Sequence, residues 1–183
     1  MKITEIESDS CGNPILPQQL FLLDCPLEEK EIFERYPNLW QYLETGKKSI
    51  ANNYLCRNRK CWYFQEYREV PLYICNYMGR ISKLNKNAFR FILNKSKAIV
   101  TNSYLALYPH KFIYNFLIYD PILTRTIWEM LNKFTALTIY NEGRLYGGGL
   151  QKIEPKELLN IDVPFLKNLL PTILDTGKSN KLF

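Results

Sequence analysis

Val70-Pro-Leu-Tyr-Ile-Cys-Asn-Tyr-Met78 and Phe89-Arg-Phe-Ile-Leu-Asn94 are short runs rich in aromatic and branched residues, which are typical of β-strands. Residues 62–65 and 98–107 have the same character, so the middle of the chain predicts a block of strands. Successive strand residues point to opposite faces. We therefore expect Phe89, Phe91 and Leu93 to share the core-facing side, with Arg90 on the other.

Helical signals lie on both sides of this block. Residues 27–46 carry apolar side chains at three- and four-residue steps, broken by Pro37 and stopped by Gly46. Asp120-Pro121 supplies an N-cap followed by a proline at the first helical position. Residues 137–140 suggest a further strand, and Glu154-Pro155 and Val163-Pro164 suggest two more helices. A strand block flanked by helices predicts an α+β fold with a short, mostly antiparallel sheet.

Composition limits the class of protein. A chain of 183 residues with 46% hydrophobic and 23% charged residues is expected to fold as one domain. Its lack of a long apolar run or a signal-peptide core predicts a cytoplasmic protein without a membrane partner. Five cysteines without a CxxC pair, beside one histidine, argue against a disulfide scaffold and a structural metal site.

Charge is distributed unevenly along the chain. The net charge is +6, but residues 47–97 contain twelve bases and two acids, whereas residues 1–46 contain three bases and nine acids. We therefore expect an acidic, partly helical segment (1–46), a basic recognition domain (47–174) and a flexible tail (175–183). Such a basic concentration suggests a polyanionic partner, and a solvated basic face without a ligand is the alternative.

Several short motifs carry the chemistry of nucleic-acid binding. Cys56-Arg-Asn-Arg-Lys-Cys-Trp-Tyr63 interleaves cations, an amide and aromatic rings, which suit phosphates, base edges and base stacking. Asn76-Tyr-Met-Gly-Arg80 adds a second amide and arginine beside a turn. The predicted DNA contacts are Arg57, Asn58, Arg59, Lys60, Trp62, Tyr63, Arg68, Asn76, Arg80, Lys83, Lys86, Arg90, Asn94, Lys95, Asn102, Arg144, Tyr146, Gly147, Gly148, Gly149 and Lys152.

Roles within this set are expected to differ. Arg59 and Arg80 stand beside asparagines and are expected to read bases, whereas Lys83 and Lys86 suit phosphates. The three successive glycines 147–149 permit positive φ and a close approach of backbone to a ligand, or tight packing on the sheet. They do not form a phosphate loop, because no GK[ST] follows at the required spacing.

Enzyme signatures are weak. His110 has no Cys or Ser nucleophile motif beside it, so no catalytic residues are predicted. Asp120 with Glu154-Pro-Lys156 loosely matches the metal-binding pattern of restriction nucleases, which makes a metal-dependent nuclease fragment one alternative. An RNA-binding module and a protein-interaction domain with a basic face are others.

Residues 54–80, the run Phe89 to Asn94, residues 128–134 and above all Arg144-x-Tyr-Gly-Gly-Gly-Leu-x-Lys-x-Glu-Pro-x-Glu-Leu158 give the chain a family resemblance. It resembles the C-terminal target-recognition region of Taq-type adenine-N6 DNA methyltransferases of bacterial restriction–modification systems, over about residues 20–170. The resemblance implies that this region reads a site in double-stranded DNA, while a separate domain binds S-adenosylmethionine and methylates a flipped adenine.

The family's catalytic motifs are missing. Asn13-Pro-Ile-Leu16 is the nearest approach to the Asn-Pro-Pro-Tyr motif of the catalytic domain, and it is not that motif. We therefore expect no cofactor and no methyl transfer in this chain alone. The resemblance then implies a fragment, one part of a split enzyme or a free-standing specificity module, with a catalytic domain as partner in cis or in trans.

Overall fold

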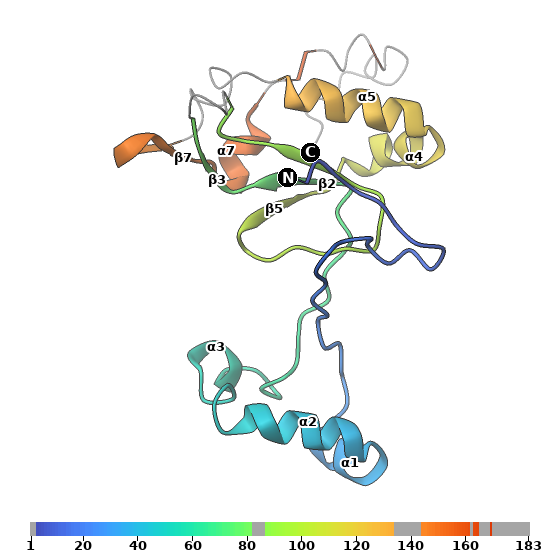
Figure 1. The fold of residues 1–183 in the computed structure, drawn as a ribbon, viewed down its shortest axis with the longest axis vertical. Helices are drawn as coiled ribbons and strands as arrows, with labels where there is room; N and C mark the ends of the chain where they lie inside the picture. Colours follow the sequence, from blue (N-terminus) through green and yellow to red (C-terminus); the bar gives the residue numbers. More distant parts are fainter. Residues whose placement is uncertain (1–2, 82–86, 134–143, 162, 165–168, 170–183) are drawn as a thin grey trace. The chain divides into compact units, whose positions relative to one another are not determined.

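A computed structural model describes residues 3–81, 87–133, 144–161, 163–164 and 169. These residues combine helices with short strands, which confirms the predicted α+β class. They form two compact units, a larger one from residues 1–17 and 69–183 and a smaller one from residues 18–68 (Figure 1). No helix within the described ranges is long and apolar enough to cross a bilayer.

The larger unit contains a four-stranded sheet with the order β1-β4-β2-β5. Its strands are β1 (Glu5–Ile6), β2 (Tyr73–Asn76), β4 (Phe91–Asn94) and β5 (Tyr104–Leu107). Strand β2 pairs antiparallel with β4 and β5, whereas β1 joins β4 in parallel. The other elements of this unit are β3 (Met78–Arg80), α4 (Lys111–Tyr119), α5 (Pro121–Asn132), β6 (Arg144–Tyr146), the 3-10 turn η1 (Gly147–Gly149), β7 (Leu150–Lys152) and α7 (Pro155–Leu159).

The central strands β2 and β4 are buried on both faces, so their sequences are nearly continuous apolar runs. On one face Phe89, Phe91 and Leu93 enter a core shared with α4, α5 and α7, as the alternation predicts. On the other face Ile74 and Ile92 pack against the N-terminal strand and residues 98–100. The apolar runs at residues 70–78 and 89–94 therefore supply the two central strands of the sheet.

Helices α5 and α7 begin where the sequence predicts. Asp120 caps α5, since its Oδ1 accepts a hydrogen bond from the Leu123 N–H at 2.9 Å, and Pro121 fills the first helical position. Glu154 caps α7 in a capping box, in which the Glu157 carboxylate accepts from the Glu154 N–H at 2.7 Å. The expected strand at 137–140 and most of the helix expected after Val163-Pro164 lie outside the described residues.

Helix α4 is not predicted by the sequence pattern. Ile113 and Leu117 are buried at helical spacing, but Phe112, Phe116 and Tyr119 on the remaining surface are exposed. An exposed side as apolar as the buried side conceals the helical period, because the period is visible only where polar residues alternate with apolar ones.

The smaller unit is helical, with α1 (Glu29–Arg35), α2 (Pro37–Lys47) and α3 (Tyr54–Arg57). The predicted break at Pro37 is confirmed, because this proline starts α2. The strand expected at 62–65 is wrong. Tyr63 instead fills the core of this unit together with Cys25, Ile32 and Leu43, and its hydroxyl donates a hydrogen bond to the Leu27 carbonyl at 2.6 Å.

The first seventeen residues belong to the larger unit. Besides the pairing of β1 with β4, the Glu5 carboxylate accepts two hydrogen bonds from Arg125, at 2.8 and 2.7 Å, and lies 2.9 Å from Lys95 Nζ. The hydrogen bonds from Arg125 and Lys95 lower the pKa of Glu5. The charge boundary expected after residue 46 is therefore not a packing boundary, since α2 runs through it. The tail 175–183 lies outside the described residues.

Candidate nucleic-acid interface

A second, three-stranded sheet brings distant cations together. Its order is β3-β7-β6, and both pairings are antiparallel. Arg80 lies opposite Leu150, and Arg144 lies opposite Lys152, while Tyr146 pairs with Leu150. Directly opposed residues in an antiparallel pair point to the same side. Arg80, Arg144, Tyr146 and Lys152 therefore share one side of the sheet, which we call the basic face.

The basic face is open to solvent. Arg80, Arg144 and Tyr146 are exposed, and Lys152 is half-buried. Gly79 and Gln151 point to the opposite side, where Gln151 is buried. One side of this small sheet thus packs inward at Gln151, although Leu145 on that side is exposed, while the other side carries cations and a tyrosine outward.

Carboxylates hold two of these cations in place. Lys152 Nζ lies 2.7 Å from Glu154 and 4.7 Å from the centre of the Tyr77 ring, and Arg144 lies 3.0 Å from Glu157. Hydrogen bonds from Lys152 and Tyr77 lower the pKa of Glu154. Ion pairs that remain in contact with solvent contribute little net stability, so a phosphate can compete for the same cations.

The hairpin between β6 and β7 turns through the glycine string. Gly148 and Gly149 both have φ of +72°, which non-glycine residues adopt at a cost. A side chain added at any of the three glycines would meet nothing within 4 Å. Of the two roles expected for the string, close packing on the sheet is therefore wrong for the described residues, and the tip of the hairpin is an exposed backbone.

Alanine substitutions separate turn geometry from ligand approach. Gly148→Ala is expected to destabilise the chain by about 1 kcal/mol, because an L-residue is strained at positive φ. Gly147→Ala is the matched control, since Gly147 has no positive φ and equally open surroundings. Urea denaturation should show a change below about 0.5 kcal/mol for this control. Equal destabilisation by both substitutions would contradict the turn geometry.

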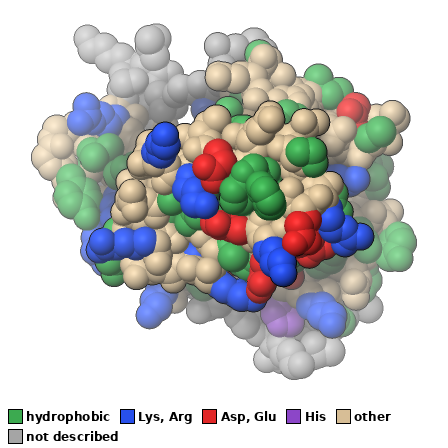
Figure 2. Space-filling view, turned by 90° about the horizontal axis from the view of Figure 1, so that it is seen from below, with side chains coloured by type: hydrophobic (Ala, Val, Ile, Leu, Met, Phe, Trp, Pro, Cys, Tyr) green, Lys and Arg blue, Asp and Glu red, His purple; other side chains and the backbone are tan. Residues whose placement is uncertain are grey.

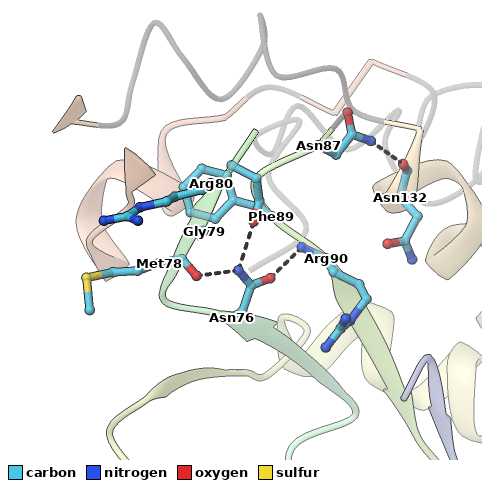
Figure 3. Close-up of a pocket in the computed structure, with 9 residues that line it drawn as sticks. Asn76, Met78, Gly79, Arg80, Asn87, Phe89, Arg90 and Asn132 are labelled. Atoms are coloured by element: carbon cyan, nitrogen blue, oxygen red, sulfur yellow. Dashed lines mark hydrogen bonds between the residues drawn. The ribbon is translucent and has the colours of Figure 1, made fainter. Parts of the chain in front are cut away.

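A polar pocket of about 420 Å³ lies beside β3 (Figure 3). Its lining includes Arg80, Asn76, Asn87, Arg90 and Asn132. The Asn76 amide joins this pocket to the sheet, since its Oδ1 accepts from the Arg90 N–H at 2.6 Å and its Nδ2 donates to the carbonyls of Met78 and Ala88, at 2.7 and 2.9 Å. The Asn76 amide therefore clamps the backbone, and its predicted role as a DNA contact stays a prediction.

Asn132 provides a second clamp that sequence reasoning missed. Its Oδ1 accepts from the Phe91 N–H at 3.0 Å, and its Nδ2 donates to the Phe91 carbonyl at 3.0 Å. The Trp128 indole also donates to that carbonyl, at 2.8 Å. Arg90 thus lies between two asparagine-held backbone segments. No local motif at the end of α5 signals this role.

The Arg90 guanidinium is unusual among the described side chains. Its Nε is buried and makes no hydrogen bond, and no described carboxylate forms an ion pair with Arg90. Burial raises the pKa of the neighbouring Cys75 thiol to about 12, although the charge of Arg90 opposes this effect. An unpaired buried donor costs free energy unless a ligand satisfies it.

Asn94 is a further correction. It is buried, and its amide donates to the carbonyls of Pro71 and Ala98, at 2.8 and 2.9 Å, while its Oδ1 accepts from the Ser96 hydroxyl at 2.8 Å. All of its partners are protein groups, so it organises the end of β4. The predicted DNA contact at Asn94 is wrong.

The predicted cluster around residues 57–63 lies in the smaller unit. Arg57 stacks over the Tyr54 ring at 5.7 Å, and Asn58 Nδ2 donates to the Tyr54 carbonyl at 2.7 Å. Trp62 packs in the core against Gly46, and the buried Tyr63 cannot stack on a base, which corrects that prediction. Arg57, Asn58, Lys60 and Arg68 are exposed and Arg59 is half-buried, so this second surface stays a prediction.

The remaining predicted contacts have mixed positions. Asn102 is exposed in the turn before β5, and Lys95 is exposed but lies 2.7 Å from Glu7 as well as near Glu5. Lys83 and Lys86 lie outside the described residues.

Acidic and basic side chains are more mixed in the folded chain than they are along the sequence. Lys47 lies 3.0 Å from Glu29, and Lys60 lies 2.7 Å from Glu28, so acids from the first 46 residues pair with bases of the middle third. Figure 2 shows red and blue side chains interspersed around an apolar patch on the side facing the viewer. The folded chain therefore presents a smaller excess of positive charge than residues 47–97 suggest.

Metal-ligating side chains are not clustered within the described ranges. No group of three or more His, Cys, Asp or Glu side chains there could hold an ion, and all five cysteines are free. Asp120 and Glu154, the pair that suggested a nuclease, each cap a helix.

Comparison with known proteins identifies the family. A model of the C-terminal domain of type II methyltransferase M.Eco57I matches residues 8–182. The chain belongs to this family. This match confirms the resemblance to a methyltransferase C-terminal region, while the finer Taq-type assignment stays a prediction.

Two relatives of this chain are type II methyltransferases. M.XamI of Xanthomonas campestris pv. amaranthicola is 26% identical over 117 residues, which are 64% of this chain and 19% of the relative. M.AccI of Acinetobacter calcoaceticus is 30% identical over 124 residues, which are 66% of this chain and 21% of the relative. The chain thus matches about a fifth of the length of these relatives. No solved structure matches it significantly.

Proposed function

We propose that this chain is the sequence-specific DNA-recognition module of a site-specific adenine-N6 DNA methyltransferase. The observation that carries the proposal is the strand register that gathers Arg80, Arg144, Tyr146 and Lys152 on one exposed side of a small sheet, in a member of a methyltransferase C-terminal family. Double-stranded DNA is its proposed partner.

The shape of this surface suits a duplex. The major groove of B-DNA admits a two-stranded β-ribbon, and the β6–β7 hairpin has an exposed tip without side chains. Cations neutralise phosphates, whereas an arginine can bind guanine O6 and N7 together. In this arrangement Arg144 and Lys152 position the hairpin on the backbone, and Arg80 reads a base edge.

Salt dependence tests the proposal directly. With about five to eight phosphate contacts, log K for duplex DNA should fall with log[salt] at a slope of about −4 to −7. Fluorescence anisotropy with labelled duplex, single-stranded DNA and RNA of one sequence would measure it. A slope near zero on duplex contradicts DNA binding, and stronger binding of the single strands would favour an RNA-binding or single-strand module instead.

The proposal assigns methyl transfer to another domain, joined in cis or in trans. The chain alone is expected neither to bind S-adenosylmethionine nor to methylate DNA, because the cofactor and adenine-binding motifs are missing from the sequence. Titration calorimetry with S-adenosylmethionine should give no heat of binding. Micromolar binding would contradict this division of labour and reveal a cofactor site within these 183 residues.

A further inference from the structure

We propose that Arg90 binds a phosphodiester group in the polar pocket, so that one backbone phosphate of the DNA is held beside the basic face. The inference rests on the proposed DNA recognition and gives it a specific anchoring site. Its ligand class is a singly charged phosphodiester, and its recognising group is the guanidinium of Arg90 together with the pocket that this residue lines.

The first argument is the unsatisfied donor. Arg90 Nε is buried without a hydrogen-bond partner, although Asn76 and Asn132 beside it have protein partners for both their amide oxygen and their amide nitrogen. Buried polar groups in folded proteins are nearly always satisfied, so an unsatisfied donor on a residue that lines a pocket points to a ligand that completes its hydrogen bonds. Because the orphan is a donor on a cation, the ligand it favours is an anion.

The second argument is preorganisation. The backbone N–H of Arg90 is fixed by Asn76 at 2.6 Å, and the next residue, Phe91, is held at both of its backbone groups by Asn132. Figure 3 shows Asn76 between the side chains of Arg80 and Arg90. An anion entering this pocket would therefore meet an arginine whose main chain does not need to be ordered on binding.

The third argument is the position of the pocket. Gly79 and Arg80 of β3 line it, and Arg80 also belongs to the basic face. Strand β3 therefore contributes both to the basic face and to the lining of the pocket. Bidentate binding by arginine is well matched to phosphate oxygens and less well reproduced by lysine.

Nuclear magnetic resonance of the arginine Nε–H groups tests the pocket without DNA. Titration of the full chain with dimethyl phosphate should shift the Arg90 Nε–H signal saturably, and Arg35, an exposed arginine of α1 paired with Glu31, serves as the matched reference. An equal shift at Arg35, or the same Arg90 shift with sodium acetate at equal ionic strength, would overturn a phosphodiester site.

A second experiment couples Arg90 to one phosphate of the duplex. Single neutral methylphosphonates are placed along the DNA, and one position should weaken wild-type binding about tenfold. Arg90→Gln should weaken binding of the unmodified duplex by a similar factor and show no further loss at that position, while Arg35→Gln keeps the wild-type pattern. If the wild type binds duplex but no position couples to Arg90, this inference fails and DNA recognition stands.

If the wild type does not bind duplex at all, DNA recognition fails, and the dimethyl phosphate titration alone decides whether the pocket binds a phosphodiester.

The variant Arg90→Met separates an effect on binding from an effect on folding. Removal of an orphan donor should leave the melting temperature of the ligand-free chain unchanged or higher, whereas a structural role for Arg90 would lower it. A lowered melting temperature together with an unshifted Nε–H signal would overturn the proposal.

Discussion

Gly79→Ala is expected to lower the free energy of unfolding by about 3 kcal/mol. A Cβ at this position would lie 1.7 Å from the carbonyl oxygen of Ala88 and 2.6 Å from its carbonyl carbon. Both are backbone atoms, so no side chain can rotate to make room. The Ala88 carbonyl also accepts the Asn76 amide at 2.9 Å, and moving it would break one arm of that clamp.

Urea denaturation of the full chain measures this effect, with Gly147→Ala as the control that adds the same methyl group in open space. The consequence extends to DNA binding, because β3 carries Arg80 next to Gly79 and pairs with β7. Gly79→Ala should therefore also weaken duplex binding under conditions where it remains folded. A stability within about 0.5 kcal/mol of wild type would show that β3 and Ala88 are not in contact as described.

Local signals in the sequence were sufficient for much of the fold. The two central strands, the break at Pro37, the cap at Asp120 and the proline start at Pro155 were predicted because each depends on residues within one turn or one strand. The α+β class follows from their order along the chain.

Long-range contacts explain why several side chains have partners in the structure that the sequence did not predict. Asn76 and Asn94 have the side chains of base-reading residues, yet their partners are backbone groups such as the carbonyls of Ala88 and Pro71. Tyr63 stands in a basic motif but packs with Ile32, far away in the sequence. No spacing rule distinguishes an amide that reads DNA from one that holds a neighbouring strand.

The basic face also depends on a long-range contact that local sequence does not reveal. Each of its residues was predicted as a DNA contact, but their shared side depends on the register between β3 and β7, which are separated by about seventy residues. Shifting that register by one residue would turn Arg80 to the opposite side from Arg144. The sequence could therefore suggest the residues and not their assembly.

Arg80→Ala is expected to weaken binding to the recognised duplex by about 1–3 kcal/mol and to affect scrambled duplex much less. Arg80 is exposed on the basic face. It lies opposite Leu150, the first residue of β7, which directly follows the glycine turn. A guanidinium placed beside a hairpin in the groove can bind guanine O6 and N7 together. Selection from a random duplex library supplies the recognised sequence, and competition binding compares it with its scrambled form.

Arg80→Lys is the sharper variant, because it keeps the charge and removes the bidentate geometry. If Arg80 reads a base, the lysine variant should bind scrambled DNA about as well as the wild type, and its preference for the recognised site should stay reduced by a similar 1–3 kcal/mol. If Arg80 only contacts a phosphate, lysine should restore both affinities together, and alanine should lower both equally with a salt slope about one unit shallower. Arg144→Ala provides the comparison within the same face, since an arginine held by Glu157 is expected to act on the backbone and to lower both affinities alike. Equal behaviour of Arg80 and Arg144 in these assays would place base reading elsewhere on the chain.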